Sequence, residues 1–453
     1  MLLCAANPAL AANKVSGFTL EKTEKNYRLS FKISPGQDFL EERREESWIL
    51  RLPAAEGNIS APIQFPPKPG VLGPFKAGRD SLGLKLTFNW SYPIPTTVTR
   101  EGDRLIVDFS RDYSLINRTP LAQGIMMEQL WFGSEKGPLA ANVIRADLNS
   151  PGVRLVPTLA FENRFGLDTT SSIAKRNGAI AAVNGSFFHK NGQPAGLLVL
   201  DHKIVTGPLF NRSVLGLRQN EGFIDNTQLS LALTLADGQS AELEGINQPR
   251  QRGTVILYDH FFGASTKTSR EESIEYLLAP QGTVMAVSGS NTPIPKEGYV
   301  LSASGAQRDW LASRLKVGES VRFKSLLNDY WEDVPYALGG GPTLIRDGKI
   351  LVSSEAERFG ADIALGKAPR TAVGITPYGE LLLVVVDGRQ PRHSVGMTLP
   401  ELAKFLLEMG AKDAINLDGG GSSTVFASGM VVNRVSDGRE RKVGNALLLY
   451  GLP

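Results

Sequence analysis

The sequence predicts an α+β protein in which a small all-β domain precedes a larger domain of mixed sheet and helices. Between residues 16 and 112, apolar and polar residues alternate with a period of two between turn residues, a pattern typical of antiparallel strands. From about residue 138 onward, strand-like runs alternate with helical patterns. The 453 residues suffice for two or three domains. We therefore expect domains at 16–112 and 138–453, joined by a linker at 113–137.

Four short runs carry the strand pattern of the first domain: 27–33, 48–52, 84–88 and 104–109. A stretch rich in proline and glycine, 62–74, is expected to form a loop inside this domain. Mainly through its closing strand at 104–109, the domain resembles the AMIN-type β-sandwich of bacterial envelope proteins. The resemblance implies a cell-wall glycan as a partner of this domain.

Two segments of the larger domain repeat one order of features. A short helix at 170–177, closed by Gly178, precedes a buried strand that ends at Asn184. A second helix begins at a capping box, 398–401, carries an apolar stripe and precedes the strand that leads to Asp418. Either these segments are halves of a diverged internal repeat whose strand ends converge on one pocket, or they are two ordinary helix–strand turns. The capping box explains Glu401 as a structural residue.

Composition excludes several classes of function. The formal net charge of +3, without a dense Lys/Arg run, argues against nucleic acid as a partner. The sole cysteine, Cys4, permits no intrachain disulfide and no cysteine-based zinc site. No segment approaches the ~20 apolar residues of a transmembrane span. Residues 1–15 look like the remnant of a signal peptide, so we expect a secreted protein or one of the periplasm or cell envelope.

The run 414–424 is the most informative motif. A short apolar strand leads to Asp418, and three glycines and three hydroxyl residues follow it: Gly419, Gly420, Gly421, Ser422, Ser423 and Thr424. Glycines permit close approach of a ligand to the backbone, and successive backbone N–H groups can form an anion-binding nest. A carboxylate next to such a nest indicates a site for a phosphate or a polyol.

Three further segments are weaker candidates for the same site. Asn184 follows a buried strand, although an asparagine there could cap its own turn. A second glycine loop, formed by Gly339, Gly340 and Gly341, could be another nest or a plain turn. Arg370 could bind a phosphate with its forked guanidinium, or it could be an ordinary surface arginine.

A second carboxylate follows a second buried strand. The apolar run 381–386 is typical of a strand buried on both faces, and it leads to Asp387 and Arg389. If the strands that end at Asp387 and Asp418 point the same way, their carboxylates lie at one edge of the sheet. Paired carboxylates can divide acid and base roles in glycosyl transfer. Alternatively, they hold Ca²⁺ or Mg²⁺, which prefer oxygen ligands; no other cofactor is expected.

Taken in order, these motifs resemble the phosphodiester glycosidase (NAGPA-like) family. The resemblance covers about residues 138–453 and rests on 184–188, 339–342, 369–374, 387–389 and 416–423, with Asn433, 437–438 and 441–446 in support. Ser186 stands where many relatives have glycine. The family implies a catalytic domain that hydrolyses the link between the anomeric carbon of a sugar and a phosphodiester.

Carried over by motif, the resemblance implies catalytic roles for Asp418, Asp387, Arg370 and Asn184. It implies substrate binding by Arg389, by both glycine loops and by the three hydroxyl residues 422–424. We expect a phosphorylated glycan of the envelope or an exopolysaccharide as substrate. The rival hypothesis is a non-catalytic envelope protein that binds glycans, because Asn, Asp and Gly loops also surround sugar hydroxyls in binding proteins.

Overall fold

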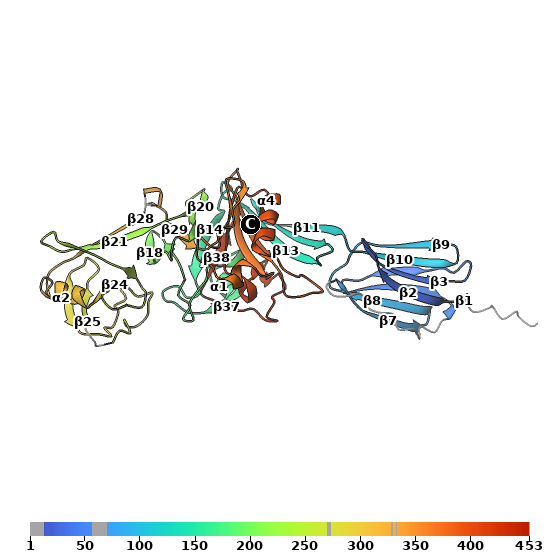
Figure 1. Cartoon of the computed structure of the whole chain (residues 1–453), viewed down its shortest axis with the longest axis horizontal. Coiled ribbons are helices and arrows are strands. Elements are labelled where there is room, and N and C mark those ends of the chain that lie inside the picture. The colour runs from blue at the N-terminus through green and yellow to red at the C-terminus, as the bar shows by residue number, and fades with distance from the viewer. Residues whose placement is uncertain (1–12, 57–69, 270–272, 328, 332, 453) are drawn as a thin grey trace, which may run out of the picture. The chain divides into compact units, whose positions relative to one another are not determined.

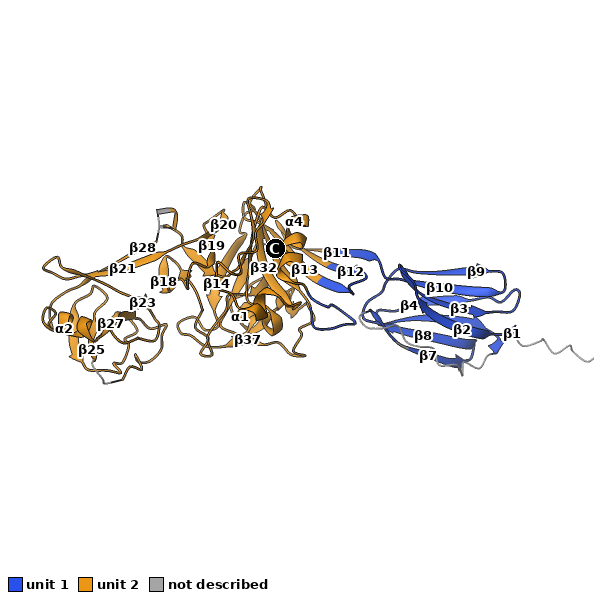
Figure 2. Cartoon of the chain, in the orientation of Figure 1, with its two compact units in different colours: residues 1–117, 130–140, 388–396 blue, residues 118–129, 141–387, 397–453 orange. Residues whose placement is uncertain are grey.

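The computed structural model describes residues 13–56, 70–269, 273–327, 329–331 and 333–452 (Figure 1). Most of the expected signal-peptide remnant at 1–15 and of the loop at 62–74 therefore lies outside the described residues. The chain divides into two compact units (Figure 2). The first consists of residues 1–117, 130–140 and 388–396, and the second of 118–129, 141–387 and 397–453.

The prediction of an α+β fold is wrong, because the structure is mostly β, with 49% of residues in strands and 8% in helices. The described part of the chain contains four α-helices: α1 (Thr170–Arg176), α2 (Ala306–Ala312), α3 (Ala361–Ala364) and α4 (Leu399–Glu408). Short 3₁₀ turns occur at η1 (Asp329–Trp331) and η2 (Gly420–Ser422). Helical periodicity was clear only in the segments that became α1 and α4, and the strands between them are too short to show their own period.

The first unit contains two four-stranded antiparallel sheets around a shared hydrophobic core. Alternate residues of the strands, such as Leu29, Trp48 and Phe88, point into this core and are fully buried. The first sheet has the order β2 (Ser16–Lys22), β3 (Asn26–Lys32), β10 (Arg104–Ser110), β9 (Thr96–Glu101). The second has the order β4 (Leu40–Arg43), β5 (Ser47–Pro53), β8 (Gly83–Trp90), β7 (Leu72–Asp80), and β1 (Asn13–Lys14) pairs with β6 (Ala55–Glu56).

The largest sheet has eight strands and carries the main motifs at one edge. Its order is β11 (Tyr113–Ala122), β12 (Ile125–Gly133), β13 (Leu139–Asp147), β33 (Glu380–Val386), β32 (Arg370–Ile375), β34 (Asp413–Asn416), β30 (Thr343–Arg346), β31 (Lys349–Ile350). The stretch 113–137, expected to be a linker, thus contains β11 and β12. The run 381–386 lies in β33, where these six residues are fully buried, as its apolar sequence predicted.

A five-stranded sheet packs with the eight-stranded sheet around the main core of the second unit. Side chains from both sheets meet there, including Leu383, Ile415 and Leu447. The order of the five-stranded sheet is β14 (Arg154–Leu159), β38 (Asn445–Tyr450), β16 (Ala181–Asn184), β35 (Val425–Ala427), β36 (Met430–Val431), and β15 (Asp168–Thr169) pairs with β37 (Lys442–Val443).

Three further sheets complete the second unit. One has the order β18 (Lys203–Thr206), β17 (Leu198–Leu200), β29 (Tyr336–Gly339), β19 (Ser213–Leu217), β20 (Gly222–Asn226). The others have the orders β22 (Ser240–Glu242), β21 (Leu229–Thr234), β28 (Arg322–Leu327), and β23 (Gly245–Ile246), β24 (Val255–Tyr258), β27 (Tyr299–Ser304), β25 (Ser273–Leu278), β26 (Val284–Ser288).

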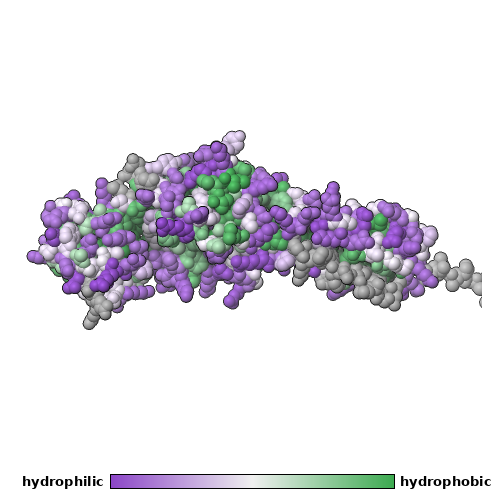
Figure 3. Space-filling view, viewed as in Figure 1, coloured by the Kyte–Doolittle hydropathy of each residue, from purple (hydrophilic) through white to green (hydrophobic). Residues whose placement is uncertain are grey.

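Hydrophilic side chains cover most of the visible surface, with a hydrophobic area on the second unit (Figure 3). Among the helices of the described ranges, none has the length and hydrophobicity that crossing a membrane requires.

Candidate functional site

The topology places the predicted motifs at one edge of the eight-stranded sheet. Strands β33 and β34 are both antiparallel to β32, which lies between them, so they point in the same direction. Asp387, after β33, and Asp418, shortly after β34, therefore lie at the same edge, where β32 begins with Arg370. Because neighbouring strands are ~4.8 Å apart, β33 and β34 are separated by roughly 10 Å.

The turn after Asn184 meets the turn at Asp418, as the sequence predicted. The side-chain amide of Asn184 donates to the carbonyl of Asp418 at 2.7 Å, and the N–H of Asp418 donates to the carbonyl of Gly185 at 3.2 Å. The Asn184 Oδ1 accepts from the hydroxyl of Thr371 at 2.7 Å and from the N–H of Thr424 at 3.1 Å. These bonds occupy Asn184 in holding β32 and both ends of the loop 418–424, which gives it a positioning role.

The Asp418 carboxyl, at this edge of the sheet, has a raised pKa. Its side chain remains partly exposed, while burial raises its pKa from the ordinary 3.8 to about 6. The hydroxyl of Ser422, the N–H of Gly419 and the positive charge of Arg441 oppose this rise. A partly exposed carboxyl that titrates near neutral pH can both reach a substrate and exchange a proton.

In the glycine loop beside Asp418, the side chains of Arg441 and Asp437 lie close to the backbone. Gly420 adopts a φ of +61°, which is the left-handed conformation that glycine tolerates. A Cβ added at Gly421 would overlap the guanidinium of Arg441 and the carboxylate of Asp437. Gly421 therefore allows a cation to lie directly against the loop that carries Asp418.

Arg441 is the residue that sequence reasoning missed. Its side chain is 45% exposed, and its Nη2 forms an ion pair with Asp437 at 2.6 Å. It belongs to the motif 441–446, but nothing in the spacing showed that its charge would act on Asp418. The meeting depends on the long-range pairing of β37 with β15 and of β38 with β16.

Asp387 supports the loop 418–424 indirectly, through hydrogen bonds to Asn433 and Arg434. One carboxylate oxygen accepts from the amide of Asn433 at 3.0 Å, and the other accepts from the N–H of Arg434 at 3.0 Å. Asn433 in turn accepts from the N–H of Val425 at 2.9 Å and donates to the carbonyl of Ser423 at 3.1 Å. Asp387 is buried, and its geometry favours a positioning role over that of a second acid or base.

Arg370 and the first glycine loop are also engaged with backbone. The Nε of Arg370 donates to the carbonyl of Met397 at 2.9 Å, and its Nη2 donates to the carbonyl of Gly366 at 2.6 Å. The N–H groups of 339–341 donate to the carbonyls of Leu197, Ser213 and Asn416. This geometry gives Arg370 and Gly339, Gly340 and Gly341 structural partners where the sequence suggested contacts with phosphate.

The other predicted residues are distributed unevenly. Ser422, Ser423 and Thr424 are buried in the loop, where the Ser423 hydroxyl accepts from that of Thr371 at 3.2 Å. Arg389 is an exposed residue of the first unit, whereas all the residues of the site just described belong to the second. The capping box is confirmed, since Thr398 and Glu401 bond reciprocally, so Glu401 is structural.

For the cation hypothesis, the structure shows a limited donor set. In the ranges that the structure describes, no three His, Cys, Asp or Glu side chains come together as a metal-binding group. Two buried oxygens of the loop region, Asn416 Oδ1 and Thr424 Oγ1, have no hydrogen-bond partner among these residues. Those neutral oxygens would suit a sugar hydroxyl or a water molecule.

A family model and several relatives match the part of the chain that carries Asp418. The family model for phosphodiester glycosidase (NAGPA) matches residues 274–450, which include Arg370, Asp387, Asp418 and Arg441 but not Asn184. The N-acetylglucosamine-1-phosphodiester alpha-N-acetylglucosaminidase of Bos taurus is 37% identical over 110 residues, which cover 22% of this chain and 20% of that enzyme. The SPbeta prophage-derived uncharacterized protein YomE of Bacillus subtilis is 41% identical over 83 residues, which cover 18% of this chain and 13% of that protein. The chain thus spans a fifth or less of either relative.

A solved structure shares the fold of nearly the whole chain. The crystal structure of a hypothetical protein from Synechocystis superposes with a TM-score of 0.69 at 21% identity, covering 97% of this chain and 80% of that one. The solved structure shows a shared fold, and within this chain residues 274–450 match the model of the phosphodiester glycosidase (NAGPA) family.

Proposed function

We propose that the chain hydrolyses a sugar-1-phosphodiester at the edge of the sheet that carries Asp418. The family of residues 274–450 and the name of the bovine relative support this type of reaction. The observation that carries the proposal is that the guanidinium of Arg441 lies against Gly421, on the same loop as Asp418, and that its charge acts on the Asp418 carboxyl, whose pKa burial raises. An acid and a cation on one loop match a substrate that has a reactive sugar carbon next to a phosphate.

In this mechanism, Arg441, whose Nε and Nη2 donate to Asp437, binds the phosphodiester through its remaining N–H groups and stabilises the charge that grows on the departing phosphate. Asp418 acts in its ionised form, either by activating water or by stabilising positive charge on the sugar ring. A phosphate monoester leaves readily, so the reaction depends less on a strong general acid than ordinary glycoside hydrolysis does. One titrating carboxyl is therefore sufficient for the chemistry.

Three residues hold this pair in place. Asn184 ties the loop 418–424 to β32, and Asp387 ties its far end through Asn433. Arg370 fastens the start of β32 to the carbonyls of Gly366 and Met397. Side chains fixed in this way keep the reacting groups oriented without reorganisation during the reaction.

The substrate that we propose is a phosphorylated glycan of the cell envelope or an exopolysaccharide, encountered outside the cytoplasm. The test is to incubate the full chain with a panel of p-nitrophenyl-phosphoryl sugars, beginning with N-acetylglucosamine, and to measure the free sugar. Release that Asp418→Asn removes is the expected result, and hydrolysis in ¹⁸O water then identifies the broken bond. Binding across the panel without turnover would favour the non-catalytic glycan-binding protein instead.

A further inference from the structure

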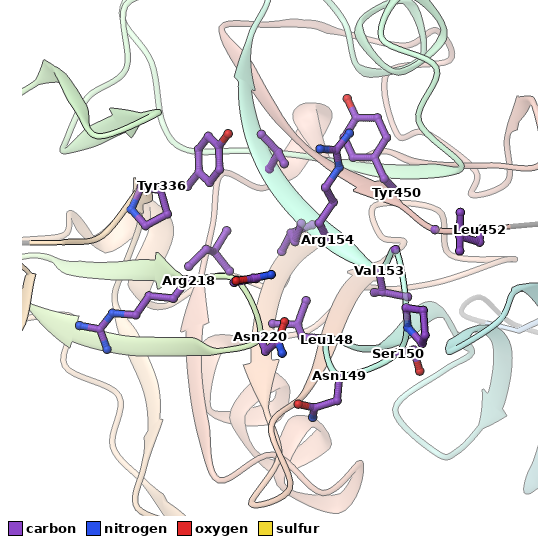
Figure 4. A pocket seen from close by; sticks show the side chains of 18 residues that line it. Leu148, Asn149, Ser150, Val153, Arg154, Arg218, Asn220, Tyr336, Tyr450 and Leu452 are labelled. Atoms are coloured by element: carbon purple, nitrogen blue, oxygen red, sulfur yellow. The ribbon is translucent and has the colours of Figure 1, made fainter.

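A cavity lies in the same unit, away from Asp418. It has a volume of about 790 Å³, within the range of small-molecule sites, and opens between the ends of two sheets (Figure 4). Arg154 begins β14 and pairs with Tyr450 near the end of β38, and Tyr336 begins β29. Asn445, at the other end of β38, contacts the turn beside Asp418. The five residue steps of β38 place this cavity roughly 17 Å from the turn beside Asp418.

The cavity has an apolar floor and a polar rim. Val153, Leu155 and Leu217 form part of the floor and belong to the main core. Amide side chains stand at the rim, on the turns 148–152 and 218–220: Asn149, Gln219 and Asn220. Apolar surface below and amide donors and acceptors above match the two kinds of surface that a sugar ring presents.

Arg154 is the cation of this cavity. Its guanidinium lies over the ring of Tyr450, with 4.7 Å between the guanidinium carbon and the ring centroid, and Figure 4 shows it reaching toward that ring. A guanidinium stacked on an aromatic face keeps its N–H groups at the edge, where they can bind an anion bidentately. Arg218 differs, because it bonds to Glu221 and to the carbonyl of Tyr330 and extends away in the same view.

The charge of the cavity favours an anion. Its lining, as far as the structure describes it, contains two arginines and no Asp or Glu. The phenols of Tyr336 and Tyr450 both line this cavity, and burial raises the pKa of Tyr450. A phenolic hydroxyl can donate a hydrogen bond to an oxyanion, and both tyrosines present one to this cavity beside Arg154.

We propose that this cavity is a binding site for a phosphorylated saccharide, with the phosphate on Arg154 and the two tyrosine hydroxyls and the sugar ring on the amide rim. Tyr450 is a positioning residue for Arg154, since its ring fixes the plane of the guanidinium. The site stands apart from the chemistry of Asp418 and does not depend on the proposed hydrolysis.

The test is a titration of the full chain, followed by ligand-observed NMR, with three probes: glucose 6-phosphate, glucose and inorganic phosphate. We expect glucose 6-phosphate to bind most tightly, and Arg154→Gln to weaken it about tenfold or more, which is the effect of losing a charge-assisted pair. Tyr336→Phe, which keeps the ring, should weaken it by a smaller factor. Arg322→Gln removes the same charge from an exposed arginine outside the cavity and should leave the affinity unchanged.

Several outcomes would overturn the proposal. Equal affinities for glucose and glucose 6-phosphate would show that the cavity does not recognise the phosphate. Equal affinities for inorganic phosphate and glucose 6-phosphate would show that it does not recognise the sugar. Wild-type affinity for glucose 6-phosphate in Arg154→Gln would show that Arg154 does not bind the phosphate. Equal losses of affinity in Arg154→Gln and Arg322→Gln would show that only the net charge of the chain matters. Arg441→Gln should still bind glucose 6-phosphate. If Arg441→Gln abolishes the binding and Arg154→Gln does not, the probe occupies the proposed hydrolytic site, and the proposed function stands while the second binding site is refuted.

Discussion

Replacing Asp418 with asparagine should stabilise the fold while it removes activity. The folded chain raises the pKa of this carboxyl from 3.8 to about 6, because burial disfavours its charged form. Each pKa unit corresponds to ~1.36 kcal/mol, so the ionised carboxyl costs the fold up to ~3 kcal/mol at neutral pH. Solvent reaches the partly exposed side chain, and we therefore expect a gain of ~1–3 kcal/mol in the neutral variant.

The sign of the pH dependence follows from the direction of the shift. Below about pH 3.8 the carboxyl is protonated in both the folded and the unfolded chain, so wild type and Asp418→Asn should differ little. As the pH rises from 3.8 to about 6, the unfolded chain loses its proton first, and the stability of the wild type falls relative to the variant. Above that interval the difference should be constant.

Thermal unfolding followed by circular dichroism from pH 4 to pH 8, at constant ionic strength, measures this difference. The unfolding temperature of Asp418→Asn should exceed that of the wild type by a few degrees at pH 7.5 and converge on it near pH 4. Asp333→Asn, at an exposed aspartate, is the matched control and should show no such trend. A variant less stable than wild type at every pH would refute the raised pKa, and turnover within a few-fold of wild type would refute the role of Asp418 in the chemistry.

Three other perturbations test the same site. In the wild type, kcat/KM should rise with an apparent pKa near 6, because only ~10% of a carboxyl with that pKa is ionised at pH 5; a rate that is flat from pH 4.5 upward would contradict a role for ionised Asp418. Gly421→Ala should lower kcat/KM about tenfold by displacing the Arg441 guanidinium, yet leave the unfolding temperature nearly unchanged because that side chain is half exposed; Gly289→Ala, with open space around its Cβ, is the control, and equal activity in both variants would remove Arg441 from the site. Asp387→Asn should destabilise the chain by ~1–3 kcal/mol in urea unfolding, since the new amide faces two donors, Asn433 Nδ2 and the N–H of Arg434; wild-type stability would contradict the hydrogen bonds assigned here.

The features that sequence could predict are those encoded locally. The capping box at Thr398, the buried strand at 381–386 and the meeting of the Asn184 and Asp418 turns all follow from patterns a few residues long. The meeting was inferable because each turn closes the same order of helix, glycine and strand. The fold class was not inferable, because most strands of the second unit have only two to six residues, which leaves no period long enough to read.

Roles that depend on distant partners were harder to assign. Arg370 has the sequence context of a phosphate ligand, but the carbonyls that its guanidinium meets belong to Gly366 and Met397 on loops outside its strand. Asp387 looked like a partner of Asp418, and its actual partners lie about 46 residues further along the chain. The role of Arg441 could not be predicted, because the sequence around an exposed arginine in a polar loop does not indicate which residues lie near it.

The way in which hydrogen bonds are distributed argues for the assignment of Asp418 and Arg441. Asn184, Asp387 and Asn433 each direct their polar atoms to the backbone or hydroxyls of the loop 418–424 or its neighbours, and Arg370 does the same for the strand beside it. Such a set of bonds fixes the loop at the cost of leaving its own members unavailable to a substrate. The Ser422 hydroxyl and the Gly419 N–H act to lower the pKa of the Asp418 carboxyl, and burial nevertheless raises it, so the ionised form lowers the stability of the folded chain. The hydrogen bonds of these polar side chains therefore hold the loop that carries Asp418 and contacts Arg441. This arrangement is expected where Asp418 and Arg441 meet a substrate.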